Sequence, residues 1–216
     1  MGISISPEED VMARPNVTYN TVKTSLGEVA LVWQHFDGGP KIIRIFLPRE
    51  DFHVVELVRE YFATPLEMHD DEVKELSRNI MAVMEGVDVQ FNLDLVKFDL
   101  CSSFQQEVLL MEKSIPWGKV STYGKIARQI GSNRSARAVG MALSRNPFPV
   151  IIPCHRAVLS NLDLGGYQGG PKLKRLLLEK EGIRFDEEGK VLPDFVIFPP
   201  RKSGLVMETS PLGTYL

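Results

Sequence analysis

The spacing of apolar residues changes near residue 98, and this change predicts two domains of different architecture. Before it, alternating or β-branched segments predict strands, and apolar residues at helical spacing predict helices. We expect residues 18–32 to form a two-stranded hairpin that turns around Leu26-Gly27, followed by strands at 41–47 and 89–95. The expected helices are 51–62 and 71–84. The first half should therefore be a small α/β domain with a mostly antiparallel sheet.

After residue 98 the sequence predicts short helices joined by tight turns. Two helices joined by a glycine-containing turn are typical of a helix-turn-helix unit, and a last helix opens at Pro171 and stops at Gly182. We expect a helix capped by Ser103 over 104–114, a turn at 115–120, a helix at 123–130, a turn at 131–133, and helices at 134–144 and 172–181. The second half should be mostly helical, which makes the whole chain an α+β protein.

The length of 216 residues allows one large domain or two small ones. The patterns favour a leader at 1–15, an α/β domain at 16–98, a helical domain at 99–185 and an extension at 186–216. No apolar run approaches the roughly 20 residues that span a bilayer, and two cysteines cannot form a disulfide framework. We expect no membrane partner, and a location in the cytoplasm of a prokaryotic cell or the nucleus of a eukaryotic one.

Charge is unevenly distributed along the chain. Residues 99–184 hold 13 Lys and Arg against 6 Asp and Glu, a balance of +7, whereas the remainder holds 12 against 22, a balance of −10. A basic half on an acidic chain suggests a polyanionic partner, although the same charges could be spread over a solvated surface.

The third helix of the second half combines arginines with small residues. Arg134, Arg137 and Arg145 lie among alanine, glycine and serine residues. Small residues let a backbone approach a surface closely, and arginine reaches phosphates and stacks on bases. The pattern fits a helix that meets DNA, and it also fits a tightly packed helix with solvated arginines.

One of the two cysteines, Cys154, stands directly beside one of the four histidines, His155. A thiolate is a strong nucleophile, and a neighbouring imidazole or cation can lower the pKa of a thiol. Pro153 restricts Ile152 to extended backbone, so Cys154 is expected to follow a short strand at 150–152. Taken alone, the pair also fits a buried structural cysteine and a surface histidine.

A glycine-rich segment, residues 165–170, follows the Cys-His pair and is called the glycine loop below. Its four glycines permit backbone geometries closed to other residues, so the loop could wall a pocket with Tyr167 as a stacking face. A plain mobile loop is the alternative. The spacing does not match a phosphate-binding fingerprint.

Residues 104–183 closely resemble the O6-alkylguanine-DNA alkyltransferases, also called methylated-DNA–protein-cysteine methyltransferases. Six segments occur in the order of that family: Ile115-Pro116-Trp117-Gly118 with Thr122-Tyr123, Arg137-Ala138-Val139-Gly140, Asn146-Pro147, Ile152-Pro153-Cys154-His155-Arg156, Gly166-Tyr167-Gln168-Gly169-Gly170, and Glu181-Gly182. The resemblance implies a ribonuclease-H-like first domain and a winged-helix-like second domain with a helix-turn-helix.

The resemblance further implies single-use transfer of an alkyl group from O6 of a flipped guanine in duplex DNA to Cys154, by a monomer without metal or organic cofactor. His155 would take the thiol proton through water and Glu181 would orient His155. Arg137 would fill the gap left by the flipped nucleotide, and Tyr123 would press on its phosphate. The implied residues are Cys154, His155, Glu181 and Asn146 for transfer, Tyr123, Arg134, Arg137, Ala138, Gly140 and Arg145 for DNA binding, and Pro149, Tyr167, Gln168 and Gly169 for the base pocket.

Two features depart from the family pattern. Gln168 stands where many relatives have serine, which leaves the range of accepted alkyl groups open. The extension at 186–216 is expected either to pack along the first domain or to be disordered. Two other functions remain, a protein that binds the lesion without repairing it and a Cys-His hydrolase, although the hydrolase leaves Arg137 unexplained.

Overall fold

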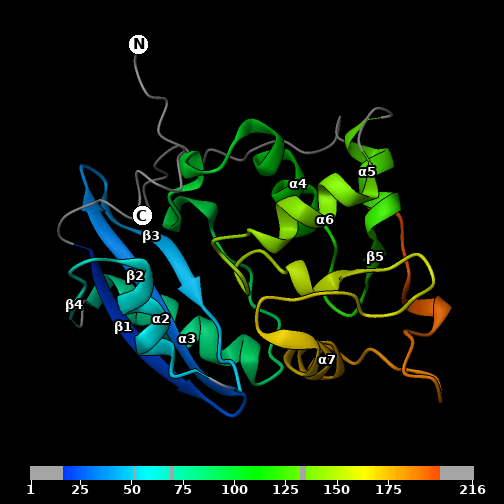
Figure 1. Ribbon diagram of the computed structural model, residues 1–216, viewed down its shortest axis with the longest axis horizontal. Helices are drawn as coiled ribbons and strands as arrows, with labels where there is room; N and C mark the ends of the chain where they lie inside the picture. Colours follow the sequence, from blue (N-terminus) through cyan, green and yellow to red (C-terminus); the bar gives the residue numbers. More distant parts are fainter. Residues whose placement is uncertain (1–16, 51, 69–70, 132–134, 200–216) are drawn as a thin grey trace, which may run out of the picture.

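The computed structural model describes residues 17–50, 52–68, 71–131 and 135–199. Figure 1 shows a sheet on one side of the molecule and a cluster of helices on the other. This arrangement is the α+β class that the sequence predicts. Arg134 and the leader at 1–15 lie outside the described residues.

The sheet is built from the first half of the chain. Its strands are β1 (Thr18–Thr24), β2 (Gly27–Phe36), β3 (Gly39–Phe46) and the short β4 (Leu66–Glu67), and their order is β3-β2-β1-β4. The pairs β1–β2 and β2–β3 are antiparallel, whereas β1–β4 is parallel. The predicted hairpin around Leu26-Gly27, the third strand and the mostly antiparallel sheet are confirmed.

Helices cover both faces of this sheet. Helix α2 (Val54–Tyr61) packs its buried Val54 and Val58 against Ala30, Val32 and Ile43. Helix α3 (Asp71–Met84) lies in the main hydrophobic cluster together with residues of the opposite strand face. Both helices were expected, because their apolar residues recur at helical spacing.

The expected strand at 89–95 is wrong. Residues 87–92 have no regular structure, and a 3-10 turn, η1 (Leu93–Leu95), follows them. The Asn92 side chain accepts a hydrogen bond from the Asp94 backbone N at 2.9 Å, and Lys113 Nζ donates to the Phe91 carbonyl at 2.8 Å. Side chains therefore bond the backbone N–H and carbonyl groups that a strand would pair with a neighbouring strand. In this segment only Val96 forms a β-bridge, with Ile42 of β3.

Three helices, α4 (Ser103–Lys113), α5 (Tyr123–Ile130) and α6 (Ala136–Ser144), pack against one another in the second half. Each has a hydroxyl residue at its N-cap, namely Ser102, Thr122 and Ser135, which accepts from a backbone N–H of the first turn. The cap of α4 is Ser102 rather than the expected Ser103. A short parallel pair, β5 (Ser121–Thr122) with β6 (Ala157–Val158), and helix α7 (Gly170–Lys180) complete this half.

The described part of the extension, residues 186–199, neither packs along the first domain nor is disordered, which were the two expectations. Val120 N donates to the Phe195 carbonyl at 3.0 Å, and Ile197 N donates to the Val120 carbonyl at 2.9 Å. The segment therefore runs beside β5 in the second half, as the orange trace next to β5 shows in Figure 1. Val191 is buried in a small cluster there with Val158 and Leu178.

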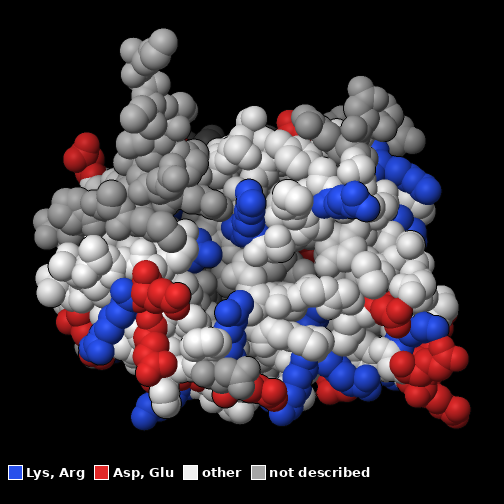
Figure 2. All heavy atoms as spheres, viewed as in Figure 1, with Lys and Arg blue, Asp and Glu red and all other residues white. Residues whose placement is uncertain are grey.

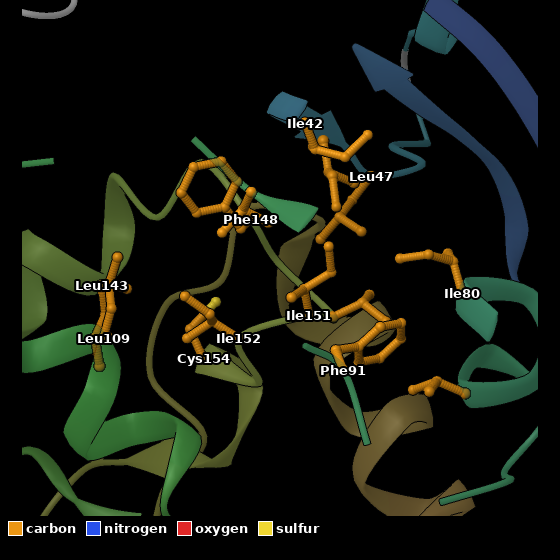
Figure 3. Close-up of a cluster of buried hydrophobic side chains, with 14 of the residues drawn as sticks. Ile42, Leu47, Ile80, Phe91, Leu109, Leu143, Phe148, Ile151, Ile152 and Cys154 are labelled. Atoms are coloured by element: carbon orange, nitrogen blue, oxygen red, sulfur yellow. The ribbon is translucent and has the colours of Figure 1, made fainter. Parts of the chain in front are cut away.

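One hydrophobic core joins the two halves. Figure 3 shows Ile42 and Leu47 from the sheet side close to Phe148 and Ile151, which precede Cys154 in the chain. Ile45 N of β3 also donates to the Pro147 carbonyl at 2.8 Å. The sheet therefore supports the segment that carries Cys154. Among the described helices, none is long and apolar enough to cross a membrane.

Candidate active site

Cys154 lies in a buried turn, residues 146–156, that connects α6 to β6 and is called the active-site turn below. Asn146 is fully buried at its start, and its Oδ1 accepts from Phe148 N at 2.9 Å. Its Nδ2 donates to the Ile152 carbonyl at 3.1 Å and lies 3.2 Å from Cys154 Sγ. One amide side chain thus closes the turn and contacts the sulfur.

The expected strand at 150–152 is absent. Val150 has a φ of 74°, and Cys154 opens a 3-10 turn, η3 (Cys154–Arg156). A β-branched residue rarely adopts a positive φ, and such strain persists only where the surroundings fix it. Here the side-chain bonds of Asn146 and the burial of Val150, Ile151 and Ile152 fix it.

A buried charge network lies behind the turn. Glu181, at the C-cap of α7, places Oε1 2.6 Å from His155 Nε2 and accepts from Arg156 Nε at 3.0 Å. Gly118 N donates to Glu181 Oε2 at 3.2 Å, and Gly118 has a φ of 71° that favours glycine. The structure therefore brings Glu181 to His155, although 26 residues separate them in the sequence.

The electrostatics of this network favour a neutral imidazole. Burial lowers the pKa of His155, and the Glu181 charge only partly offsets this effect. Burial alone would raise the pKa of Glu181, but His155 and Arg156 together lower it. The carboxylate beside Nε2 favours a proton on that nitrogen, which leaves Nδ1 able to accept one. Nδ1 is buried and has no partner among the described residues.

Cys154 is 5% exposed, and burial raises the pKa of its thiol to about 12. The Asn146 hydrogen bond and the charge of Lys174 oppose this rise, whereas Glu112 adds to it. The resting residue is therefore a thiol at neutral pH. It reacts as a nucleophile only when a neighbouring base takes its proton.

A pocket of about 670 Å³ opens onto Cys154. Figure 2 shows a hollow near the middle of this face with Lys and Arg side chains around it. Of the predicted residues, the pocket is lined by Cys154, Tyr123, Arg137, Gly140, Tyr167 and Gln168. A pocket of this size holds a nucleobase with its alkyl group.

Four of the expected DNA or pocket residues do not line this pocket: Ala138, Arg145, Pro149 and Gly169. Ala138 is half-buried on α6 and Arg145 is exposed just after it, whereas Pro149 is buried within the active-site turn. Gly169 is the N-cap of α7. These four residues therefore lie outside the pocket wall, and of them Arg145 lies on the outer surface.

Gln168 reaches the active-site turn through its side chain. Its Nε2 donates to the Asn146 carbonyl at 2.7 Å, while Arg49 Nε donates to the Gln168 carbonyl at 2.9 Å. The amide therefore occupies part of the pocket wall and ties the glycine loop to the residue that contacts Cys154. Beside it, the ring of Tyr167 packs edge-on against His155, with centroids 6.2 Å apart.

Sequence reasoning missed three residues near the site. Arg49 lines the pocket from the first half, and Glu112 and Lys174 are fully buried charged residues. A buried position for Lys174 could have been suspected from the apolar Leu173, Leu177 and Leu178 around it in α7. Nothing in the local sequence marks Arg49. In the described part of the chain, no group of His, Cys, Asp and Glu is arranged to hold a metal ion.

Comparisons with known proteins identify relatives of this chain. The family model described as 6-O-methylguanine DNA methyltransferase, DNA binding domain, matches residues 103–183. A methylated-DNA–protein-cysteine methyltransferase of Methanothermobacter thermautotrophicus is 44% identical over 114 residues, 53% of this chain and 64% of that protein. One from Saccharolobus solfataricus is 54% identical over 120 residues, 55% of this chain and 75% of that protein.

Solved structures extend the likeness beyond the matched segment. The crystal structure of Mycobacterium tuberculosis OGT in complex with DNA has a TM-score of 0.61 and 28% identity, and covers 76% of this chain and 92% of that chain. The O6-methylguanine-DNA methyltransferase of Pyrococcus kodakaraensis, at 23% identity and a TM-score of 0.59, shares the fold over 78% of this chain and 100% of that chain. The likeness therefore includes the sheet-containing half.

Proposed function

The chain belongs to the methylated-DNA–protein-cysteine methyltransferase family, and we propose that it repairs DNA by moving an alkyl group from O6 of guanine to the sulfur of its own Cys154. The observation that carries this assignment is the position of Cys154. Its sulfur lies at a nucleobase-sized pocket, in contact with Asn146 and next to the buried His155–Glu181 pair.

The reaction follows from this arrangement. His155 takes the Cys154 proton through water at Nδ1, and Glu181 stabilises the imidazolium that results. The sulfur attacks the alkyl carbon, so that an S–C bond forms while the C–O6 bond breaks. Guanine leaves with the electron pair of that bond and takes up a proton. The product is S-alkylcysteine, and because no step regenerates the thiol, each molecule reacts once.

The DNA partner fits the pocket and the helices around it. O6 of guanine lies inside the base stack, so the nucleotide has to flip out to reach Cys154. Arg137, on α6 at the pocket, occupies the gap in the duplex, and Tyr123, at the start of α5, contacts the phosphate of the flipped nucleotide. Arg134 and Arg145 contact neighbouring phosphates. The relative from M. tuberculosis was crystallised with DNA.

Neither alternative function is favoured. A protein that only binds the lesion has no use for a nucleophile, and Cys154 is present and lies at the pocket. A Cys-His hydrolase does not account for the arginine on α6. We further propose that the chain acts as a monomer, inside the cell, with 16–98 supporting the site and 99–185 carrying it.

Incubation with a duplex containing O6-methylguanine should add the mass of one methyl group to the protein, located on the Cys154 peptide. Intact-protein mass spectrometry followed by peptide mapping measures this directly. A duplex with unmodified guanine is the control. Tight binding to the lesion without any mass gain would leave the lesion-binding function instead.

Shortening Gln168 should widen the range of accepted alkyl groups. The Gln168→Ser variant removes the amide that fills the pocket wall and bonds the Asn146 carbonyl, so it should react roughly 10-fold faster with O6-benzylguanine. Methyl transfer should change much less, because a methyl group needs little room. Single-turnover rates for the two substrates test this, and an equal change in both would assign Gln168 a purely structural role.

A further inference from the structure

Helix α6, which the structure describes throughout, exposes one large apolar side chain, that of Met141. It is 55% exposed. The other exposed residues of the helix and its C-cap are small or charged, namely Ala136, Arg137, Ser144 and Arg145. Exposed apolar residues are common on protein surfaces, so the position of Met141 decides whether it has a role.

Met141 lies on the side of α6 that faces away from the core. The helix buries Val139, Ala142 and Leu143 in the main hydrophobic cluster. Arg137 and Met141 lie on the opposite side, about 40° apart around the helix axis, because each residue of an α-helix turns by about 100°. They are four residues apart, which places their Cβ atoms about 6 Å from each other. Met141 is therefore the neighbour of Arg137 on the exposed face.

This exposed face continues into the pocket at Cys154. Arg137 lines the pocket, and so does Gly140, the residue directly before Met141. The described residues that line it include two arginines, Arg49 and Arg137, and no acidic residue. Figure 2 shows Lys and Arg side chains around the hollow on this face. A surface of this charge suits a polyanion, so the partner that reaches Met141 is the duplex bound at the pocket.

A duplex with a flipped nucleotide offers an apolar surface to Met141. Flipping takes one base out of the stack and uncovers the bases on either side of it. Nucleotides of one strand are spaced about 3.4 Å apart along the duplex, so a side chain about 6 Å from Arg137 reaches the next one or two of them. Methionine is one of the apolar residues that proteins insert at base steps, and its flexible thioether adapts to irregular surfaces.

We propose, on the basis of the function assigned to Cys154, that Met141 packs against the bases and sugars beside the gap that Arg137 fills. The contact stabilises the duplex in the form that has the guanine flipped into the pocket. Arginines bind phosphates and displace counterions, whereas a thioether displaces none. Met141 thus supplies a part of the affinity for the lesion that does not depend on salt.

Titration of an O6-methylguanine duplex between about 50 and 200 mM salt tests this, with Cys154→Ser as the parent so that no transfer occurs. Met141→Ala should weaken binding about 10-fold at every salt concentration, the loss expected for partial burial of a methionine side chain. The slope of log Kd against log salt should stay unchanged. Arg145→Ala should instead lower that slope by about one, because it removes a phosphate contact. Met141→Leu, which keeps the apolar bulk, should bind within about twofold of the parent.

Met81→Ala is the matched control, since Met81 is a 40% exposed methionine on α3 in the first half. It should change neither the affinity nor the slope. On a duplex with unmodified guanine, Met141→Ala should cost less than about threefold, because the uncovered bases are present only when a nucleotide is flipped. Unchanged affinity for the lesion duplex, an equal loss on both duplexes, or a loss with a lowered salt slope would each overturn the inference.

Two reactions with Cys154 intact separate this inference from the proposed function. Free O6-benzylguanine has no neighbouring bases, so Met141→Ala should react with it at the wild-type rate, and a slower reaction would show a disturbed pocket and overturn the role of Met141. A salt-independent loss of lesion affinity supports that role even where the wild type takes no methyl group from DNA. Normal methyl transfer by the wild type, with unchanged affinity in Met141→Ala, supports the repair function and removes the role of Met141.

Discussion

Replacing Cys154 with serine should abolish alkyl transfer while leaving the fold and the affinity for duplex DNA unchanged. A hydroxyl group is a far weaker nucleophile than a thiol at neutral pH, because its oxygen holds its proton more strongly. Serine is close to cysteine in size, so the contact with Asn146 Nδ2, 3.2 Å from the sulfur in the native protein, can be kept. The loss should therefore be confined to the chemical step.

Two measurements check this result. Intact-protein mass spectrometry after a long incubation with O6-methylguanine duplex should show no added methyl group, and a fluorescence titration should give a dissociation constant within about twofold of wild type. Cys101→Ser is the control, since Cys101 is also buried but does not line the pocket. Methylation of Cys154→Ser at the wild-type rate would mean that another residue accepts the alkyl group.

Much of the fold could be predicted because its elements repeat a strong local pattern. The hairpin at Leu26-Gly27 and helix α3 follow directly from alternation and from helical spacing. The strand expected at 89–95 fails because alternation reports which side chains are buried and not whether a neighbouring strand is available. There, Asn92 and Lys113 bond the backbone instead.

The active-site turn shows the same limit at the site itself. The β-branched residues 150–152 favour a strand, but Asn146 holds the segment in a turn with Val150 at a positive φ. This constraint comes from an amide side chain whose partners cannot be read from local preference. The same holds for the buried Glu112 and Lys174, which are 62 residues apart in the sequence and whose charges affect Cys154 only in the folded chain.

Glu181→Gln is expected to have the second-largest effect, on both stability and rate. Glu181 is the carboxylate that His155 and Arg156 share, and its side chain is 1% exposed. The amide removes the negative charge and leaves the cation of Arg156 buried without its counter-ion. Breaking a buried pair in this way destabilises a protein by about 3 kcal/mol. An amide also stabilises the imidazolium of His155 poorly, so transfer should slow by about 100-fold.

The pH dependence identifies the cause of this loss. The pKa of Glu181 is lowered in the folded protein, so its contribution to stability is fully present above the pKa of the unfolded chain and disappears as the pH falls through the folded value. Urea unfolding should therefore give a large difference between wild type and Glu181→Gln at pH 7 and a shrinking one toward pH 3. Glu179→Gln, which removes a half-exposed carboxylate of the same helix, should change stability by less than about 1 kcal/mol throughout. A difference that stays constant with pH would show that altered packing, and not the lost charge, destabilises the variant.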